Sequence, residues 1–137
     1  MKKLILLFLS VVVLVGCQSK SVTGETVTVT GGSYQNIAPA ELNTMLKSKD
    51  FVFVNVHIPF AGNIADTDLS IPYDQISTSE NLLQLPADKS AKIVLYCRSG
   101  HMSTIAAEEL VKLGYTNVWN LAGGMMEWER AGFKLEK

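Results

Sequence analysis

A short apolar run, followed by a cysteine and then by a helical pattern, is the feature that most constrains the fold. The run Ile93-Val94-Leu95-Tyr96 has the length and β-branched content of a buried strand. Beyond the cysteine, apolar residues recur at helical spacing: Met102, Ile105, Ala106, Leu110 and Leu113. Cys97 is therefore expected at the carboxyl end of a strand, where the first N–H groups of a helix converge. That position favours bound anions and the thiolate form of a cysteine, so Cys97 is predicted to be a nucleophile.

Strand and helix patterns alternate along most of the chain. We expect strands at 51–56, 93–96 and 117–121, and helices at 39–46, at 80–85 after Ser79, from the cysteine loop to 113, and at 125–130. Gly114 and Gly132 follow two of these helices as stop signals, and Gly123-Gly124 indicates a tight turn. This order predicts an α/β fold with a mainly parallel sheet and right-handed crossovers. Ligands in such sheets bind beyond the carboxyl ends of the strands.

The first part of the chain resembles the export signal of a bacterial lipoprotein. A short basic start precedes the apolar run 4–15, which is shorter than the roughly 20 residues that a membrane-spanning helix needs. The run Leu14-Val15-Gly16-Cys17 then resembles the lipobox, the motif whose cysteine is lipidated and becomes the new first residue. We therefore expect a signal peptide over residues 1–16 and lipid on Cys17. The alternative is an uncleaved anchor with an incidental cysteine.

Lipid on Cys17 would hold the protein on a membrane of the cell envelope, facing away from the cytoplasm. Gln18 stands where an aspartate would resemble the inner-membrane retention signal of Gram-negative lipoproteins, so in a Gram-negative cell we expect the outer membrane. Residues 17–33, which begin with the lipidated cysteine, are rich in Ser, Thr and Gly and are predicted to form a flexible tether. The alternation of Thr and Val at 26–30 leaves an edge strand open as an alternative. The folded domain is predicted at 34–137.

The charge of the chain argues against nucleic acid as a partner. Without Lys2 and Lys3, 10 basic and 13 acidic residues remain, which gives a net charge of −3. The basic residues are scattered lysines and two arginines, Arg98 and Arg130, whereas binding to a phosphate backbone needs a basic patch. Nucleic acid is therefore not an expected partner, whereas lipid on Cys17 makes a membrane one.

Three blocks of the sequence resemble the rhodanese family. The first joins 53–57 with 62–64 and 71–72, the second is the loop 97–103, and the third joins 121–124 with Trp128 and 131–132. The resemblance implies the three-layer rhodanese-like fold, with a mainly parallel central sheet flanked by helices. It also implies a sulfurtransferase, in which the Cys97 thiolate accepts a sulfane sulfur as a persulfide and passes it to a thiol or to cyanide. No cofactor and no metal are expected.

The resemblance also implies roles for the residues around the cysteine. The residues expected to bind the donor and cradle its sulfur with backbone N–H groups are Arg98, Ser99, Gly100, His101 and Met102. The Ser103 hydroxyl would hydrogen-bond the Cys97 sulfur or cap the helix. Asn55 and His57 are expected to contact the residues that form the site rather than the substrate itself, and His57 is expected to form structural hydrogen bonds.

The chain departs from the family at three of these places. The family usually has an acidic residue where Asn55 stands, and arginines where His57 and Met102 stand. An arginine in place of Met102 would bring positive charge to an anionic donor such as thiosulfate, and a hydrogen bond to a charged group is worth about 1.5–3 kcal/mol. Arg98 and a protonated His101 are the candidates to replace that charge. A site with less charge favours a less charged donor, such as a persulfide or polysulfide.

Other interpretations compete with sulfur transfer. A catalytically weak module of the same fold would bind a partner at the membrane surface. A cysteine phosphatase or arsenate reductase would need an arginine in place of Ser103. A zinc site formed by Cys97, His101 and His57 lacks a fourth ligand. Cys97 as a buried structural thiol is the plainest alternative.

Overall fold

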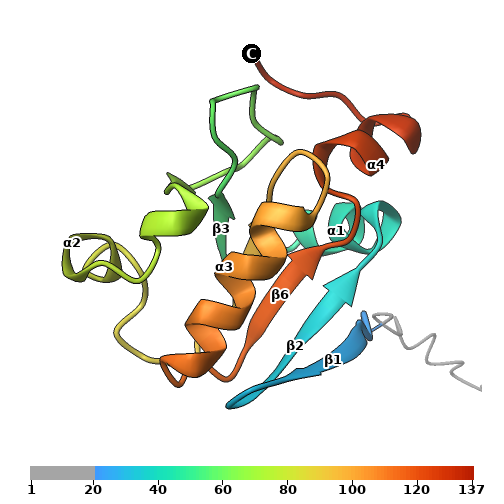
Figure 1. The fold of residues 1–137 in the computed structure, drawn as a ribbon. Coiled ribbons are helices and arrows are strands. Elements are labelled where there is room, and N and C mark those ends of the chain that lie inside the picture. Colours follow the sequence, from blue (N-terminus) through green and yellow to red (C-terminus); the bar gives the residue numbers. More distant parts are fainter. Residues whose placement is uncertain (1–20) are drawn as a thin grey trace, which may run out of the picture.

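The computed structural model describes residues 21–137, which form one mixed six-stranded sheet with helices on both faces (Figure 1). The strands are β1 (Glu25–Val29), β2 (Gly32–Ile37), β3 (Val52–Asn55), β4 (Leu69–Ser70), β5 (Ile93–Tyr96) and β6 (Val118–Leu121). The helices are α1 (Pro39–Leu46), α2 (Ser79–Leu82), α3 (His101–Lys112) and α4 (Gly124–Arg130), with the 3-10 turn η1 at Tyr73–Gln75.

The sheet has the strand order β1-β2-β6-β5-β3-β4. Every neighbouring pair is parallel except β1 and β2, which pair antiparallel. The carboxyl ends of β2, β6, β5 and β3 therefore meet along one border, here called the carboxyl edge, and their amino ends form the opposite amino edge. The predicted α/β class with a mainly parallel sheet is confirmed, and Cys97 follows β5 at the centre of the carboxyl edge.

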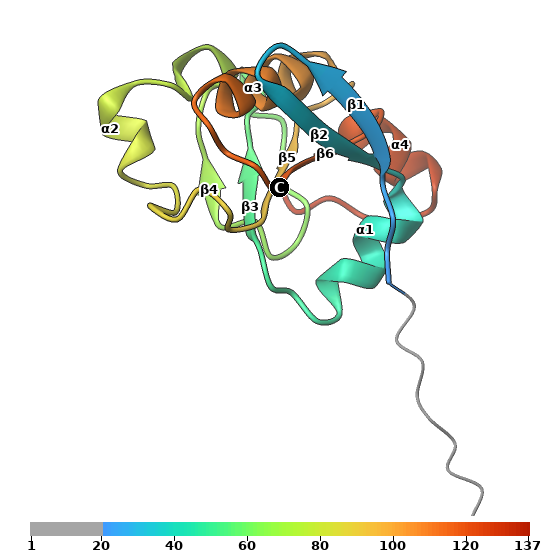
Figure 2. The same ribbon diagram turned by 90° about the horizontal axis from the view of Figure 1, so that it is seen from below.

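Packed side chains cover both faces of the sheet, and successive residues of β5 point to opposite faces. Figure 2 shows α3 and α1 on opposite sides of the strands. The side chains of Leu95 and Cys97 belong to the α3 layer, whereas Val94 and Tyr96 belong to the layer under α1 and α4. All four residues of β5 are buried, as expected for a central strand that is covered on both faces.

Local signals explain why several elements form where the sequence predicts them. The helix expected at 39–46 is α1 residue for residue, and the strand expected at 93–96 is β5. Pro39 occupies the first turn of α1, and the Ala38 N–H donates a hydrogen bond to the Glu41 carboxylate at 2.7 Å. The helix expected at 80–85 is the shorter α2, and Thr78, rather than Ser79, caps it by accepting a hydrogen bond from the Asn81 N–H at 3.4 Å.

The prediction of a tether through residue 33, with the domain starting at 34, is wrong for the described part of that segment. Residues 25–29 form β1, the edge strand that the Thr-Val alternation left open, and β2 begins at Gly32. The pair is held in register by hydrogen bonds between the Thr26 and Gln35 side chains at 3.0 and 3.1 Å. Val27 and Val29 pack against the α3 layer, so the strand buries one face. The predicted signal peptide, the predicted lipidation site Cys17 and residues 18–20 lie outside the described residues.

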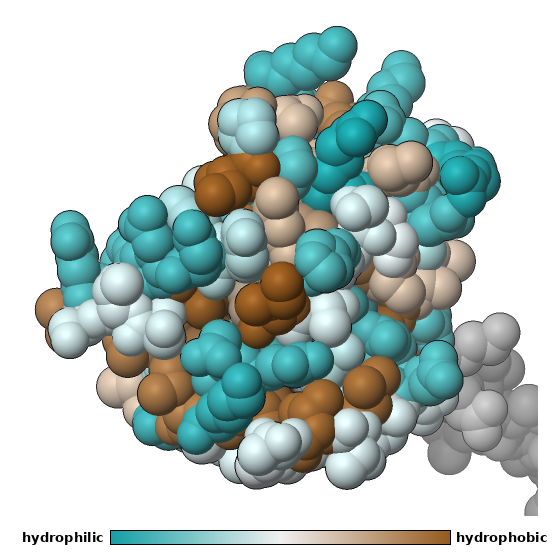
Figure 3. Space-filling view, in the orientation of Figure 1, coloured by the Kyte–Doolittle hydropathy of each residue, from teal (hydrophilic) through white to brown (hydrophobic). Residues whose placement is uncertain are grey.

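The surface is mainly polar on the face that carries α3. Figure 3 shows apolar areas there that are small and separated by polar side chains. Within residues 21–137, no helix has the length and apolar character needed to cross a membrane.

Candidate active site

Cys97 is enclosed at the end of β5 with hydrogen-bond donors directed at its sulfur. The residue is only 1% exposed and carries a free thiol. The Gly100 N–H donates to Sγ at 3.0 Å, and the Ser103 hydroxyl lies 3.4 Å from the same atom. Both groups can donate hydrogen bonds to a sulfur on which negative charge develops during a reaction.

The loop between β5 and α3 curls around the sulfur because Gly100 adopts a left-handed conformation. Its φ is +95°, which side-chain-bearing residues rarely adopt, and it stands at the N-cap of α3. The Ser103 hydroxyl also lies 3.2 Å from the Gly100 carbonyl oxygen, so its single proton is shared between that oxygen and Sγ. Ser103 is fully buried, and its hydroxyl therefore belongs to the wall around the thiol.

The turn Gly123-Gly124 brings the start of α4 against this loop. The N–H groups of Met125 and Met126 donate to the carbonyl oxygens of Cys97 and Arg98 at 2.9 and 3.0 Å. A Cβ on Gly124 would lie 2.3 Å from the Cys97 carbonyl oxygen, so only glycine permits this approach. In a trans peptide the C=O and N–H bonds point in opposite directions. The N–H groups of Arg98 and Ser99, which share peptide units with these two carbonyls, therefore point away from α4.

The remaining residues of the loop differ in exposure. Arg98, Ser99 and His101 are exposed, and His101 is the first residue of α3. Met102 is half-buried and packs against the α3 layer, the same cluster that contains Cys97. The place where the family usually has an arginine is therefore occupied by an apolar side chain that contributes to the core.

Asn55 connects β3 to the loop that follows it on the carboxyl edge. Its side-chain N–H₂ donates to the Gly62 carbonyl at 3.0 Å and to the Asn63 side-chain oxygen at 2.9 Å. Its side-chain oxygen accepts a hydrogen bond from the His57 backbone N–H at 3.0 Å. Asn55 is buried, and an amide is required here because the site needs both donors and an acceptor.

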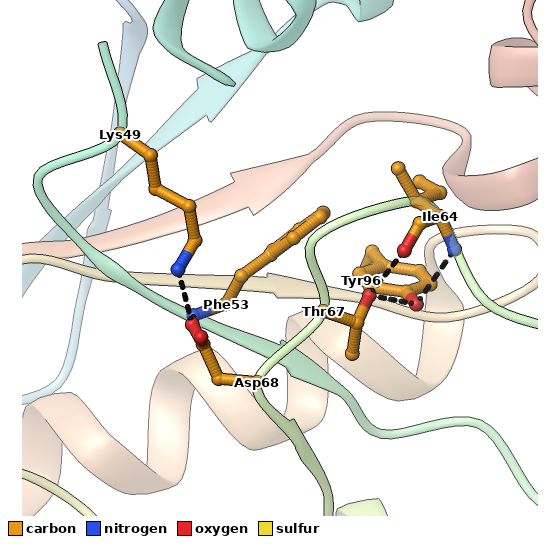
Figure 4. A network of polar contacts seen from close by, with 6 residues as sticks. All are labelled: Lys49, Phe53, Ile64, Thr67, Asp68 and Tyr96. Atoms are coloured by element: carbon orange, nitrogen blue, oxygen red, sulfur yellow. Dashed lines mark hydrogen bonds and ion pairs between the residues drawn. The ribbon is translucent and has the colours of Figure 1, made fainter. Parts of the chain in front are cut away.

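Tyr96, the residue before the cysteine, holds the same loop from the other layer of the sheet. Its hydroxyl accepts a hydrogen bond from the Ile64 N–H at 3.0 Å and lies 2.7 Å from the Thr67 hydroxyl (Figure 4). It also donates to the Asn63 side-chain oxygen at 3.2 Å. Burial raises the pKa of Tyr96 above its ordinary value, so the hydroxyl keeps its proton and can donate.

Figure 4 also shows hydrogen bonds of Asp68, which hold the end of the loop between β3 and β4. The Asp68 carboxylate accepts hydrogen bonds from the Phe53 N–H at 2.7 Å and from the Lys49 ammonium at 2.6 Å. Asp68, Tyr96 and Asn63 were not predicted from the sequence as parts of this network. A polar tyrosine at the end of an apolar strand is the one signal that could have indicated the network.

The surroundings of His57 favour the neutral form of its imidazole. Burial, and then the positive charge of the Arg98 guanidinium, lower the pKa of His57 below its ordinary value of 6.5. Its Nδ1 is buried and has no hydrogen-bond partner among residues 21–137. No three His, Cys, Asp or Glu side chains gather as a metal site in the described part of the chain.

Comparison with known proteins identifies the family. The model of the rhodanese-like domain matches residues 39–131. The chain belongs to the rhodanese-like domain family. A crystal structure of a rhodanese-related protein from Thermoplasma volcanium has a TM-score of 0.61 and 28% identity, and the match covers 74% of this chain and 97% of that one. The rhodanese match begins at Pro39, so β1 and β2 precede it although both belong to the sheet.

Two curated relatives of this rhodanese-like domain are named as sulfurtransferases. A putative mitochondrial thiosulfate sulfurtransferase of Schizosaccharomyces pombe is 32% identical over 94 residues, which cover 58% of this chain and 64% of that protein. A probable adenylyltransferase/sulfurtransferase of Mycobacterium tuberculosis is 33% identical over 97 residues, which cover 69% of this chain. The match spans only 24% of the mycobacterial protein, so it concerns one part of a longer chain.

Proposed function

We propose that the chain is a rhodanese-type sulfurtransferase with Cys97 as its nucleophile. The thiolate attacks the outer sulfur of a donor, a new S–S bond forms on Cys97, and the remainder of the donor leaves with the electron pair of the broken bond. A thiol or cyanide then attacks the outer sulfur of the persulfide and releases the Cys97 thiolate. The observation that supports this proposal best is the pair of donors at Sγ, the Gly100 N–H at 3.0 Å and the Ser103 hydroxyl at 3.4 Å.

The charge around the loop favours a persulfide or polysulfide donor over thiosulfate. Met102 offers no cation beside the sulfur, and burial and the charge of Arg98 keep the pKa of His57 low, so that residue adds no positive charge near neutral pH. Arg98 is the charged group of the loop, but its exposed side chain leaves its charge screened by water. Hydrogen bonds from backbone N–H groups suit a monoanionic sulfur without requiring a second charge.

The acceptor must come from outside the chain. The sequence contains two cysteines, Cys17 and Cys97. With lipid on Cys17, no second thiol remains to resolve a persulfide as an internal disulfide. A small thiol or cyanide would therefore complete the reaction.

We further propose that residues 1–16 are removed and that Cys17 carries lipid, which holds the protein in the cell envelope facing away from the cytoplasm. The basic start, the apolar run 4–15 and the sequence Leu-Val-Gly-Cys at 14–17 support this proposal. Expression in a bacterial host, followed by mass spectrometry of the N-terminal peptide, tests it. The expected peptide begins at an acylated Cys17, and an unmodified Cys17 in a protein that fractionates with the soluble pool would overturn it.

Mass spectrometry after incubation with a sulfur donor tests sulfur transfer directly. The folded, reduced protein should gain the mass of one sulfur atom at Cys97 with polysulfide and lose it on addition of cyanide. Cys97→Ser is the control and should gain nothing. A native protein that polysulfide and thiosulfate both fail to load, while near-UV circular dichroism shows it folded, would refute the proposal and leave the binding module as the function to pursue.

A further inference from the structure

β1 is an edge strand that lacks the usual protection within the described part of the chain. Its outer side has no partner strand among residues 21–137, and Figure 1 shows it at the border of the sheet. Proteins usually guard such an edge by making the strand short, or by placing lysine, proline or a bulge on it. The opposite edge strand, β4, has only two residues, whereas β1 has five in an unbroken register with β2. The edge at β1 is therefore open to further pairing.

The side chains of β1 also suit a further strand. Glu25 is its only charged residue, and the four that follow alternate threonine and valine, which are both enriched in strands. Thr26 and Thr28 are exposed, whereas Val27 and Val29 pack against the α3 layer. A strand beside β1 would find threonines on one face and valines on the other. The rhodanese match begins after β1, at residue 39, so this edge is a feature of this chain outside the matched domain.

The backbone of β1 leaves donors and acceptors free at two residues. The Ile37 carbonyl oxygen accepts a hydrogen bond from the Ala122 N–H at 2.9 Å, so the odd-numbered residues of β2 direct their backbone groups to β6. The even-numbered residues consequently direct theirs to β1, whose odd-numbered residues stand opposite them. Since this direction alternates along a strand, the N–H and C=O groups of Thr26 and Thr28 point outward.

We propose that two copies of the chain pair through β1, antiparallel and with the two-fold axis at Val27. Thr26 then stands opposite Thr28 of the second copy, and the two residues exchange their outward backbone hydrogen bonds. The axis repeats the same exchange on its other side. Val27 meets its own counterpart on the face that α3 covers, and threonine meets threonine on the other face, which is a favourable cross-strand pair.

The charge on the strand favours a second copy in this direction. Antiparallel pairing about Val27 places Glu25 opposite Val29, which is uncharged. Parallel pairing in the same register would instead bring Glu25 against its own counterpart, and like charges directly opposite each other are destabilising. The strand is therefore complementary to itself when it is antiparallel, and a second copy is the occupant that needs no other sequence.

The pair leaves both Cys97 sites free. The strand order puts three spacings between β5 and β1 in each copy, and one more joins the copies, so seven spacings, roughly 34 Å, separate the two β5 strands. Antiparallel pairing also turns the two carboxyl edges to opposite borders of the joined sheet. A pair of five-residue strands is small beside a standard interface of about 1,200–2,000 Å², so the association is transient. The proposal needs neither lipid on Cys17 nor sulfur transfer.

Disulfide trapping with the full chain tests this pairing. Val27→Cys and Val29→Cys are compared in the Cys97→Ser background, where Cys17 is retained. Position 27 meets its counterpart at a Cα distance of about 4.5 Å, within disulfide range. Position 29 lies four residues from its counterpart, about 13 Å along the strand and beyond that range. Mild oxidation should give 27–27 linked dimers, identified by mass spectrometry, and no dimer at 29 above the Cys97→Ser parent. Equal dimer at both positions would overturn the proposed pairing.

A second comparison isolates the outward backbone groups. Thr28→Pro removes one outward N–H, and an edge strand tolerates proline where its nitrogen faces away from the neighbouring strand. Added to Val27→Cys, it should abolish the dimer, whereas Thr28→Ala should retain it. Near-UV circular dichroism shows whether each variant is folded. A dimer that persists in a folded Thr28→Pro protein would refute pairing through β1. A Val27→Cys chain that gives no dimer at any concentration would overturn the second copy as the partner and favour a strand of another protein.

Discussion

The backbone N–H of Met125 donates a hydrogen bond to the Cys97 carbonyl oxygen at 2.9 Å, so the start of α4 fixes the peptide that carries the nucleophile. The contact forms only because Gly124, with φ +58°, brings the backbone of α4 within reach of the loop. The glycine pair thus acts on the site by permitting close approach as well as by supplying unusual backbone angles.

Replacing Gly124 by alanine should disrupt this contact. The added Cβ would lie 2.3 Å from the Cys97 carbonyl oxygen, and overpacking of this kind costs about 1–3 kcal/mol beyond the strain of a positive φ. Gly132→Ala is the matched control, since φ there is +91° but no atom lies within 4 Å of the new Cβ. Urea unfolding should give a lower stability for Gly124→Ala by about 1 kcal/mol or more relative to the control, and sulfur loading should slow. Equal stabilities would show that the loop accommodates the methyl group.

Asn55→Asp should destabilise the fold although it restores the acidic residue usual in the family. The carboxylate would face two acceptors, the Gly62 carbonyl and the Asn63 side-chain oxygen, with no proton to donate. A buried group left without its partner costs about 1–3 kcal/mol. Asn36→Asp serves as the control, because Asn36 accepts a hydrogen bond from Asn120 through its side-chain oxygen, which aspartate retains. A loss no larger than that of Asn36→Asp in chemical denaturation would contradict the assigned role of the amide.

Met102→Arg should raise the turnover of thiosulfate relative to that of polysulfide. A guanidinium at this position adds a charged hydrogen bond to a dianionic donor, and an interaction of about 1.5–3 kcal/mol corresponds to about tenfold or more in kcat/KM. Met126→Arg adds the same charge at the neighbouring start of α4 and controls for a general change in the field. If both variants behave alike, or if thiosulfate turnover falls in a folded Met102→Arg protein, this account of the donor preference is wrong.

His57 should make the stability of the domain depend on pH in the weakly acidic range. Burial and the charge of Arg98 lower the pKa of His57 in the folded state, so the unfolded chain binds a proton more readily. The stabilisation is complete above the ordinary pKa of 6.5 and is lost as the pH falls from there to the lower folded-state pKa. His57→Gln should therefore lose less stability than the parent between pH 7 and pH 5, as read from urea midpoints. A parent and a His57→Gln variant with parallel pH profiles would refute the shift.

The centre of the fold follows from local signals in the sequence. The run 93–96 is apolar throughout because β5 is covered on both faces. Of the residues at helical spacing after it, Ala106 and Leu110 are buried and Met102 and Leu113 pack against the same core, whereas the buried Ala107 and Val111 did not stand out in that pattern. Pro39 and Glu41 determine the start of α1 within a few residues. Where the partners of a residue lie close in sequence, prediction and structure agree.

The parts that sequence reasoning missed depend on distant partners. β1 is a short strand with one half-buried face, and only its pairing with β2 distinguishes it from a polar linker. Similarly, the donors that Asn55 supplies are directed to residues seven and eight positions away, and Tyr96 is 32 positions from Ile64. No pattern in the chain specifies such pairs before the sheet brings them together.

The burial of Cys97 also bears on how long the thiol survives outside a reducing compartment. A disulfide between two copies would need their cysteine Cα atoms within about 7 Å, and a sulfur that is 1% exposed behind Gly100 and Ser103 cannot meet its counterpart at that distance. Enclosure thus prevents covalent dimers without a second cysteine or a dedicated reductase. A small donor or acceptor, such as a polysulfide, a small thiol or cyanide, has less to displace at this atom than a second protein does, so the residues that enclose Cys97 also protect the nucleophile.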